Sequence, residues 1–369
     1  MTKYLLDLPT PSNINYMWNF GSLLGLNFMI QFFTGFFLSM YYVSNINLSF
    51  DSIYYIMMDV NNGWVIRMLH VNGASFFFIF CYFHIGRSMY YGNYMNMTVW
   101  FSGIVILLLL FSISFLGYVL PWGQMSFWGA TVITKLITAV PYIGDVLVEW
   151  IWGGFILGNA TLSRFFSLHF FLPFIMFVFV FFHLLLLHID GSTNPVNSMK
   201  DLDKIPFHPY FLFKDILGFI IFFFMLFIFS TLFSDMFFDC ENFNLANSMV
   251  TPHLIKPEWY FLFAYCILRS VPNKLGGVVA LLMSILILVV LPLSDFSKFK
   301  YMSFYPYMSL LYMYFVFIFI FLIFFGSKVV EQPYITFSIY FSIMYFMYFL
   351  IVNIMKMFMD FYVLHFKFM

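Results

Sequence analysis

Charged side chains are scarce in this chain. Its 369 residues include only sixteen basic and sixteen acidic ones, 9% in all, and the formal net charge is zero. A water-soluble protein of this length needs far more charge to cover its surface. A balanced charge also lacks the basic excess that attracts nucleic acid. We therefore expect neither a soluble protein nor a nucleic-acid partner.

Cysteine is equally scarce. Cys81, Cys240 and Cys266 are far apart, and the sequence contains no C-x-x-C-H motif and no clustered pair. Thioether-linked haem and iron–sulfur clusters both need such patterns. We expect neither group in this chain.

Apolar residues, by contrast, are abundant. They make up 63% of the chain, and the mean hydropathy is +0.93. Eight apolar segments are long enough to cross a ~30 Å hydrocarbon layer. They cover residues 19–42, 64–91, 97–120, 162–190, 212–234, 275–294, 305–326 and 334–357. The sequence predicts an all-α integral membrane protein with eight transmembrane helices and both termini on one face.

Four histidines within these segments form two pairs of equal spacing. His70 and His84 are fourteen residues apart in the second segment, and so are His169 and His183 in the fourth. Fourteen residues turn a helix through about 1400°, about 40° short of four turns, and rise about 21 Å. Both members of a pair therefore face nearly the same direction at different depths.

The predicted topology matches the two pairs. The second and fourth segments run in the same direction, so His70 lies level with His169, and His84 with His183. Two imidazoles at one depth suit a six-coordinate haem iron that transfers electrons. A lone histidine in an apolar helix is more often structural, but the repeated spacing favours two non-covalent b-type haems, one above the other, in a bundle of the first four helices.

A second regularity supports the haem interpretation. Gly21 and Gly35 are fourteen residues apart in the first segment, and Gly103 and Gly117 in the third. Glycine lets a flat macrocycle approach the backbone closely. Topology places Gly35 and Gly117 beside the first haem, and Gly21 and Gly103 beside the second.

Three arginines lie within five residues of the histidines: Arg67, Arg87 and Arg164. Each guanidinium is placed to pair with a haem propionate. Snorkelling to the membrane interface explains the same positions equally well.

Two long connections are too apolar for free loops. The first, 116–134, contains Pro121 and two tryptophans, and the second, 235–274, contains Glu258 within an apolar stretch. An acid in such a setting indicates a functional site. Both connections lie on the side of the first haem, where together they would cover a pocket.

On the opposite face, the fourth segment ends at His188, and Lys214 and Asp215 open the fifth. A histidine and an aspartate near the second haem would suit protonation of a reduced oxygen. Ordinary interfacial solvation is the alternative.

These residues are specific enough to suggest a family. The chain resembles the mitochondrial cytochrome b family, the haem-bearing subunits of quinol:cytochrome c oxidoreductase (complex III). The resemblance covers nearly the whole chain. It rests on the histidine pairs, on W-N-F-G-S-L-L-G at 18–25, G-Y-V-L-P-W-G-Q at 117–124 and P-E-W-Y at 257–260, and on the run 264–277.

The resemblance implies a role for each site. His70 and His169 would hold the low-potential haem, and His84 and His183 the high-potential haem. The quinol oxidation site would contain Glu258, Tyr265, Tyr118 and Gly129, and the quinone reduction site would contain His188, Ser192, Asp215 and Ser22. The family more often has an acid directly after the histidine at 188, so here Asp190 would take that role.

The resemblance also implies a setting. Ubiquinol would be oxidised at one face and ubiquinone reduced at the other, with proton translocation by a Q cycle. The partners would be a Rieske iron–sulfur protein, cytochrome c1 and other complex III subunits, in a dimeric complex of the mitochondrial inner membrane. Residues 1–210 would form the dihaem bundle, and 211–369 a region that contributes to the oxidation site. The last spans would be lipid-facing scaffold.

Two other classes of protein remain as alternatives. A dihaem reductase for a metal ion or the ascorbate radical would need a donor-binding domain or a basic docking face, and this chain shows neither. A transporter with haem-free histidines would show inverted repeats and broken helices with charges at midmembrane.

Overall fold

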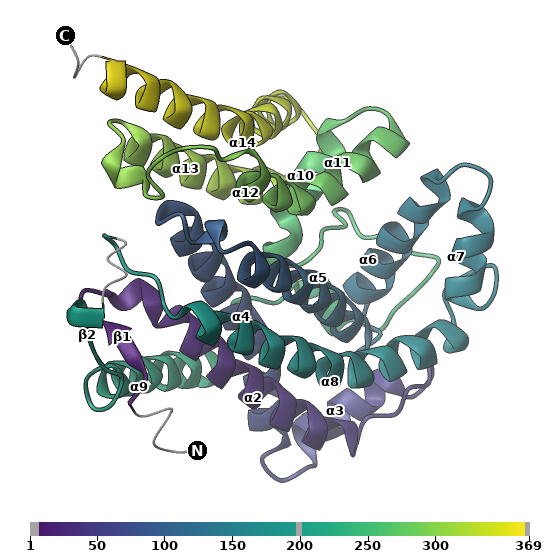
Figure 1. Ribbon diagram of the computed structural model, residues 1–369. Coiled ribbons are helices and arrows are strands. Elements are labelled where there is room, and N and C mark those ends of the chain that lie inside the picture. Colours follow the sequence, from purple (N-terminus) through teal and green to yellow (C-terminus); the bar gives the residue numbers. More distant parts are fainter. Residues whose placement is uncertain (1–6, 197–200, 366–369) are drawn as a thin grey trace.

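The computed structural model describes residues 7–196 and 201–365. Within them, eight helical segments are long and apolar enough to cross a membrane, as the sequence predicts. They run side by side in Figure 1. The spans are α2 (Phe20–Ser39), α4 (Gly63–Tyr90), α5 (Met97–Val119), α8 (Asn159–Asp190), α9 (Tyr210–Thr231), α11 (Lys274–Leu286) with α12 (Val290–Ser294), α13 (Met308–Gly326) and α14 (Tyr334–His365).

Shorter elements lie at the ends of the spans. On the side where α2 ends are α3 (Ser49–Met58), α6 (Gln124–Lys135), α7 (Gly144–Trp152) and α10 (Leu262–Ser270). At the opposite end, β1 (Pro9–Pro11) pairs antiparallel with β2 (Lys204–Pro206). Figure 1 shows the two strands at the left and α6 and α7 at the right. The connection 116–134, which the sequence indicated was too apolar for a free loop, contains most of α6, but the sequence predicted neither α3 nor the small sheet.

The first four spans form the predicted bundle, in which α2 packs along α4 and α5 along α8. Local backbone chemistry sets where the spans stop. The chain leaves α8 at Gly191, whose φ of +76° is favoured by glycine. Gly92, with φ of +66°, follows α4 in the same way.

Helix α9 packs against this bundle. Phe222 and Leu226 of α9 are buried with Leu23 of α2 and with Phe76 and Phe80 of α4. The boundary after residue 210 remains a prediction. The first helix of the predicted C-terminal region nevertheless lies on the N-terminal bundle (Figure 1).

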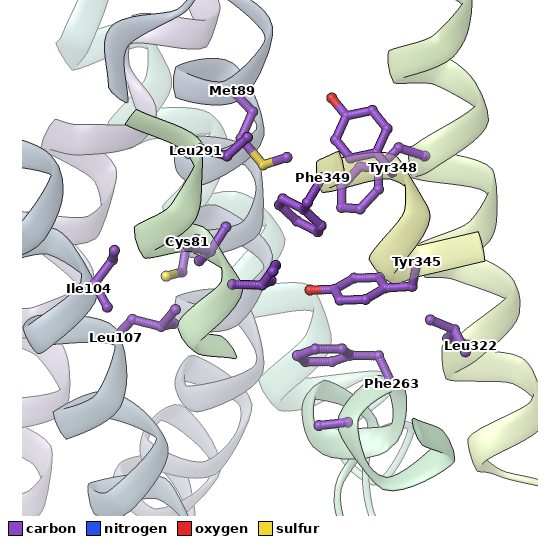
Figure 2. Packing of buried hydrophobic residues seen from close by; sticks show 14 of the residues in the cluster. Cys81, Met89, Ile104, Leu107, Phe263, Leu291, Leu322, Tyr345, Tyr348 and Phe349 are labelled. Atoms are coloured by element: carbon purple, nitrogen blue, oxygen red, sulfur yellow. The ribbon is translucent and has the colours of Figure 1, made fainter. Parts of the chain in front are cut away.

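The remaining helices form a second packed group in which α10, α13 and α14 contact one another. Figure 2 shows Tyr345, Tyr348 and Phe349 of α14 among buried side chains, near Phe263. The ring of Phe315 stacks on that of Tyr348, with centroids 4.2 Å apart. The expectation that the last spans are lipid-facing scaffold is therefore wrong for this face of α14.

The sixth span is interrupted near Pro292. A proline has no N–H to give the carbonyl four residues earlier, and its ring crowds that carbonyl. The chain passes through a 3₁₀ turn at Ile287–Val289, and the Leu288 carbonyl accepts a hydrogen bond from Trp100 Nε1 at 2.8 Å. The neighbouring span thus satisfies the group that the proline leaves open.

A buried ion pair ties the end of α14 to the rest of the molecule. Lys356 is fully buried, and its Nζ lies 2.8 Å from Asp295 Oδ2. The Tyr94 hydroxyl donates to the same oxygen at 2.5 Å. Burial alone would raise the pKa of the Asp295 carboxyl, but the charge and hydrogen bond of Lys356, with hydrogen bonds from Ser297 and Tyr94, outweigh burial and lower the pKa.

Candidate functional site

Inside the first bundle each histidine of α4 meets one of α8. From here on, His70 with His169 is called the first pair, and His84 with His183 the second pair. The rings of His70 from α4 and His169 from α8 lie with centroids 6.2 Å apart and planes at 89°. The rings of His84 and His183 lie 6.5 Å apart at 61°. The structure thus brings together the residues that the predicted topology placed level with each other, at two depths of the bundle.

These separations fit one metal ion between each pair of rings. Imidazole nitrogens bind metal at about 2.0–2.1 Å, so two that share an ion lie about 4 Å apart. The measured centroid distances of 6.2 and 6.5 Å exceed this by about the radii of two five-membered rings. Two imidazoles at each depth are a donor set that would hold a haem iron, and a bound haem would supply one-electron transfer there.

The four glycines each face an imidazole edge. A Cβ on Gly117 would lie 2.4 Å from His169 Cε1, and one on Gly35 would lie 2.9 Å from His70 Cε1. At Gly21 and Gly103 the corresponding distance, to the second pair, is 3.4 Å. The glycines therefore make room for the histidine rings, and room for a macrocycle beside them stays a prediction.

A large apolar cavity adjoins the first pair. Most of the side chains that line it are apolar. The predicted site residues that line it are Gly35, Arg67, His70, Gly117, Tyr118, His169 and Glu258. One continuous space therefore connects the first histidine pair with the carboxyl of Glu258.

Buried donors near the second pair lack acceptors. The guanidinium of Arg87 lies 5.1 Å from the Trp18 ring, and Arg87 Nε and Trp18 Nε1 are both buried without a hydrogen-bond partner. Unpaired buried donors are costly and need an acceptor. An anionic group such as a haem propionate would satisfy both, so the residues present fit a haem at this depth.

The other two arginines differ in setting. Arg67 lines the cavity of the first pair. Arg164 is exposed and donates to the backbone carbonyls of Trp150 and Ile151 at the end of α7.

A second, smaller cavity lies between α5, α6 and the turn that carries Glu258. Tyr118, Gly129 and Glu258 are among its lining residues, and a Cβ on Gly129 would meet no atom within 4 Å. Tyr118 and Glu258 also line the large cavity, so the two spaces share a wall. Three of the four residues predicted for quinol oxidation meet here.

The carboxyl of Glu258 is set up to exchange a proton near neutral pH. Burial raises its pKa to about 7, and Asp239 adds to this, whereas the Tyr118 hydroxyl and Lys256 oppose it. The fourth predicted residue, Tyr265, donates to the Ile255 carbonyl at 3.1 Å.

Gln124, at the start of α6, is hydrogen-bonded to residues 244–250 of the second long connection. Its side chain accepts from Asn247 N at 2.7 Å and donates to the Val250 carbonyl at 2.6 Å. Its backbone N–H donates to the Asn244 carbonyl. From the sequence, Gln124 was noted only as part of the motif at 117–124, and no sequence signal singles it out, because its burial is known only from the structure.

At the opposite face, the structure brings together two of the four predicted residues. Ser22 Oγ donates to Asp215 Oδ1 at 2.9 Å. His188 is exposed near the end of α8, and Ser192 follows Gly191 in the connection beyond it. Asp190 accepts from Asn96 Nδ2 at 2.8 Å.

Comparisons with known proteins agree with this geometry. A family model described as cytochrome b/b6/petB matches residues 5–191. A second, cytochrome b(C-terminal)/b6/petD, matches residues 245–346. A solved structure titled "Hyperthermophilic respiratory Complex III" superposes with a TM-score of 0.93 at 31% sequence identity, and the match covers 97% of this chain and 95% of that one.

Proposed function

The chain belongs to the cytochrome b/b6 family, and on that premise we propose that it is the electron-transfer subunit of a ubiquinol:cytochrome c oxidoreductase, a respiratory complex III. The observation that carries the proposal is the pairing of four imidazoles at two depths, each pair spaced for one metal ion. Membership of the family implies b-type haem.

His70 and His169 would hold one haem, and His84 and His183 the other. Bound haem supplies one-electron transfer, and two haems at different depths supply it across the membrane. The propionates would be held by Arg67 at the first site, by Arg87 with Trp18 at the second, and by Arg164 near the first.

Quinol oxidation would take place beside the first histidine pair. Glu258 is the proposed proton acceptor, because its carboxyl lines both cavities and has a pKa near 7. Tyr118 and Tyr265 would orient the ring of ubiquinol, and Gly129 would leave space for it.

Ubiquinone reduction would take place at the other face. The hydrogen-bonded pair of Ser22 and Asp215 offers a carboxyl for proton delivery, and His188 and Ser192 would bind the quinone from the end of α8. Release of protons at one face and uptake at the other amounts to proton translocation, the Q cycle.

The chain would act only in an assembly, because it carries no iron–sulfur acceptor of its own. We propose a Rieske protein, cytochrome c1 and further subunits as partners, in a dimeric complex of the mitochondrial inner membrane. In this scheme 1–210 is the dihaem bundle and 211–369 contributes to the oxidation site.

A redox titration of the visible spectrum of the purified complex tests the proposal. The unsubstituted complex should show two b-type components, with one lost in His70→Ala and the other in His84→Ala. A complex without b-type absorbance would contradict the proposal and favour a haem-free transporter.

A further inference from the structure

The carboxyl of Glu258 belongs to a turn that two other elements hold by hydrogen bonds. On the side after Glu258, Trp259 Nε1 donates to Ser75 Oγ at 3.1 Å. The Tyr82 hydroxyl donates to the Tyr260 carbonyl. Both partners belong to α4, so a membrane span fixes the residues that follow the carboxyl.

The residues before Glu258 are held by α10 instead. The Tyr265 hydroxyl donates to the Ile255 carbonyl at 3.1 Å. Ile255 stands three residues before Glu258 and two before Pro257, and both of these later residues line the smaller cavity. A displacement of the Tyr265 ring would therefore move the chain that leads into the carboxyl.

The ring of Tyr265 is itself held by Arg269. The two residues are four positions apart on α10, so their side chains lie on one face of the helix. The guanidinium carbon of Arg269 lies 4.6 Å from the ring centroid, within the distance at which a cation is attracted to an aromatic face. Arg269 thus restrains the ring whose hydroxyl bonds to Ile255.

Arg269 also reaches the end of α13. Its Nη1 donates to the Lys328 carbonyl at 3.0 Å. Its Nη2 donates to the carbonyls of Phe325 and Gly326, at 2.9 and 3.0 Å. The last carbonyls of a helix have no partner within it, and a cation suits the partial negative charge at this end. The end of α13 therefore anchors the guanidinium.

Gly326 allows α13 to come this close. A Cβ at Gly326 would collide with the Leu262 carbonyl oxygen, and a glycine permits such an approach of two backbones. Leu262 is the first residue of α10, and Arg269 lies in its last turn. The end of α13 is therefore fixed against both ends of the helix that carries Tyr265.

We propose that Arg269 is a positioning residue for proton transfer at Glu258. It fixes the ring of Tyr265, and the Tyr265 hydroxyl holds the Ile255 carbonyl and with it the chain that leads into the carboxyl. The end of α13, the guanidinium, the phenol and the turn form one connection. This inference rests on the proposed function, because it takes Glu258 as the proton acceptor for quinol.

Loss of this connection should change how deeply the Glu258 carboxyl is buried. Burial is the largest cause of its raised pKa, near 7, and a looser turn admits water, which lowers the pKa towards its ordinary value. The other ionisable groups around the carboxyl are Tyr118, Asp239, Lys256 and Tyr260, with Arg67 and the first pair across the large cavity. Substitution of Arg269 removes none of these groups.

The pH dependence of kcat/KM for ubiquinol, measured on the purified complex, tests the proposal, because it reports the pKa of the free enzyme's base. Arg269→Met should lower the midpoint of the profile by about one pH unit, with both b-type components retained. Arg269→Lys keeps a cation but loses the fork that binds several carbonyls, and should lower it less. Tyr265→Phe keeps the ring but loses the bond to Ile255, and should also lower it.

Lys328→Met is the matched control. It removes a cation from the same end of α13, where the ammonium lies 4.6 Å from the Phe324 ring, and it keeps the backbone carbonyl that Arg269 uses. The midpoint should stay unchanged. The double variant Arg269→Met with Tyr265→Phe should lower the midpoint no further than the more strongly affected single variant, because both changes break one connection.

The possible results are distinct. An unchanged midpoint in Arg269→Met and Tyr265→Phe would overturn this inference and leave the proposed function intact. An equal shift in Lys328→Met, or additive shifts in the double variant, would also overturn it. If Arg269→Met does not assemble, Arg269→Lys and Tyr265→Phe decide. A profile that Glu258→Gln does not alter would instead contradict the proposed role of Glu258.

Discussion

Gly117 lets α5 approach the His169 ring closely, because glycine carries a hydrogen atom where other residues carry a Cβ. The virtual Cβ of Gly117 lies 2.4 Å from the His169 ring, and that of Gly103 lies 3.4 Å from the His183 ring. The first distance is impossible without movement of helix or ring, and the second is close to ordinary contact. The two positions should therefore differ in whether they tolerate substitution by alanine.

The corresponding prediction compares the two glycines. Gly117→Ala should displace His169 and remove the b-type component that His70 and His169 would hold, whereas Gly103→Ala should keep both components. Gly25→Ala is the control, because a Cβ there meets no atom within 4 Å. It should stabilise the helix by up to about 1 kcal/mol. Optical spectra of the purified variants give the answer, and equal haem content in all three would contradict the prediction.

Glu258 gives a prediction about pH. With a pKa near 7, its carboxyl is protonated below that pH and cannot accept a proton from quinol. The quinol oxidation rate should therefore fall as pH drops through about 7, and Glu258→Gln should lower the rate at pH 8 and flatten this dependence. Glu149→Gln, at an exposed position on α7, should leave the profile unchanged. An unchanged pH profile in Glu258→Gln would exclude this carboxyl as the acceptor.

Residue-level reasoning from the sequence reached some of these features and not others. The fourteen-residue spacing of histidines and glycines places each set on one helix face, and the span directions then predict which histidines meet, so the pairing could be predicted from the sequence. The hydroxyls beside the rings could not, because Thr34, beside His70, and Ser102, beside His183, resemble any hydroxyl residue in an apolar helix.

At the scale of elements, the buried ion pair of Lys356 and Asp295 anchors α14 to the chain that follows α12. Removal of one partner leaves an uncompensated buried charge, which costs about 3–5 kcal/mol. The Asp295 pKa is lowered, so this stabilisation is present near neutral pH and is lost as pH falls below the ordinary carboxyl range.

Lys356→Met should thus destabilise the protein by about 3–5 kcal/mol, and a second change, Asp295→Asn, should recover part of the loss. Lys256→Met is the matched control. Its pair with Asp239 spans 3.2 Å but is partly exposed, at 37% and 11%, and such pairs contribute about 0–1 kcal/mol. Unfolding in detergent measures each loss, and equal losses in the two lysine variants would argue against the anchor.

Sequence reasoning located the spans well because eight apolar segments leave few alternatives in a membrane. It missed α3, which is short, and the two-stranded sheet, whose strands pair residues almost two hundred positions apart in the sequence. It also took the last spans for scaffold. The buried face of α14 is revealed by Asn353 and Lys356, polar residues that a lipid-facing helix would avoid.

At the scale of the whole molecule, the connection between α6 and α7 and the strand β2 are separated along the chain by one span, α8, so they lie on opposite faces (Figure 1). Leu202, just before β2, is 93% exposed, and Tyr142, just before α7, is 104% exposed. A membrane-impermeant maleimide should label Leu202→Cys from the face of the termini and Tyr142→Cys from the other. Labelling of both from one face would refute the eight-span topology.

The whole-molecule arrangement was the easiest part to predict, and the family comparison supports it. Composition alone requires a membrane, and the direction of each span follows from the count. The assembly around the chain has no such signature, because a subunit interface and a lipid-facing surface are both apolar.

The fourteen-residue interval between histidines also has an electrical consequence. Two sites about 21 Å apart along the helix axes span about two-thirds of a ~30 Å hydrocarbon layer. An elementary charge moved across the full layer costs about 2.3 kcal/mol per 100 mV, so an electron that passes between the proposed sites works against about 1.5 kcal/mol of this. A membrane potential of about 100 mV would shift the distribution of an electron between the two sites about tenfold. The spacing of the four histidines along the helices therefore sets how strongly the membrane potential opposes electron transfer between the sites.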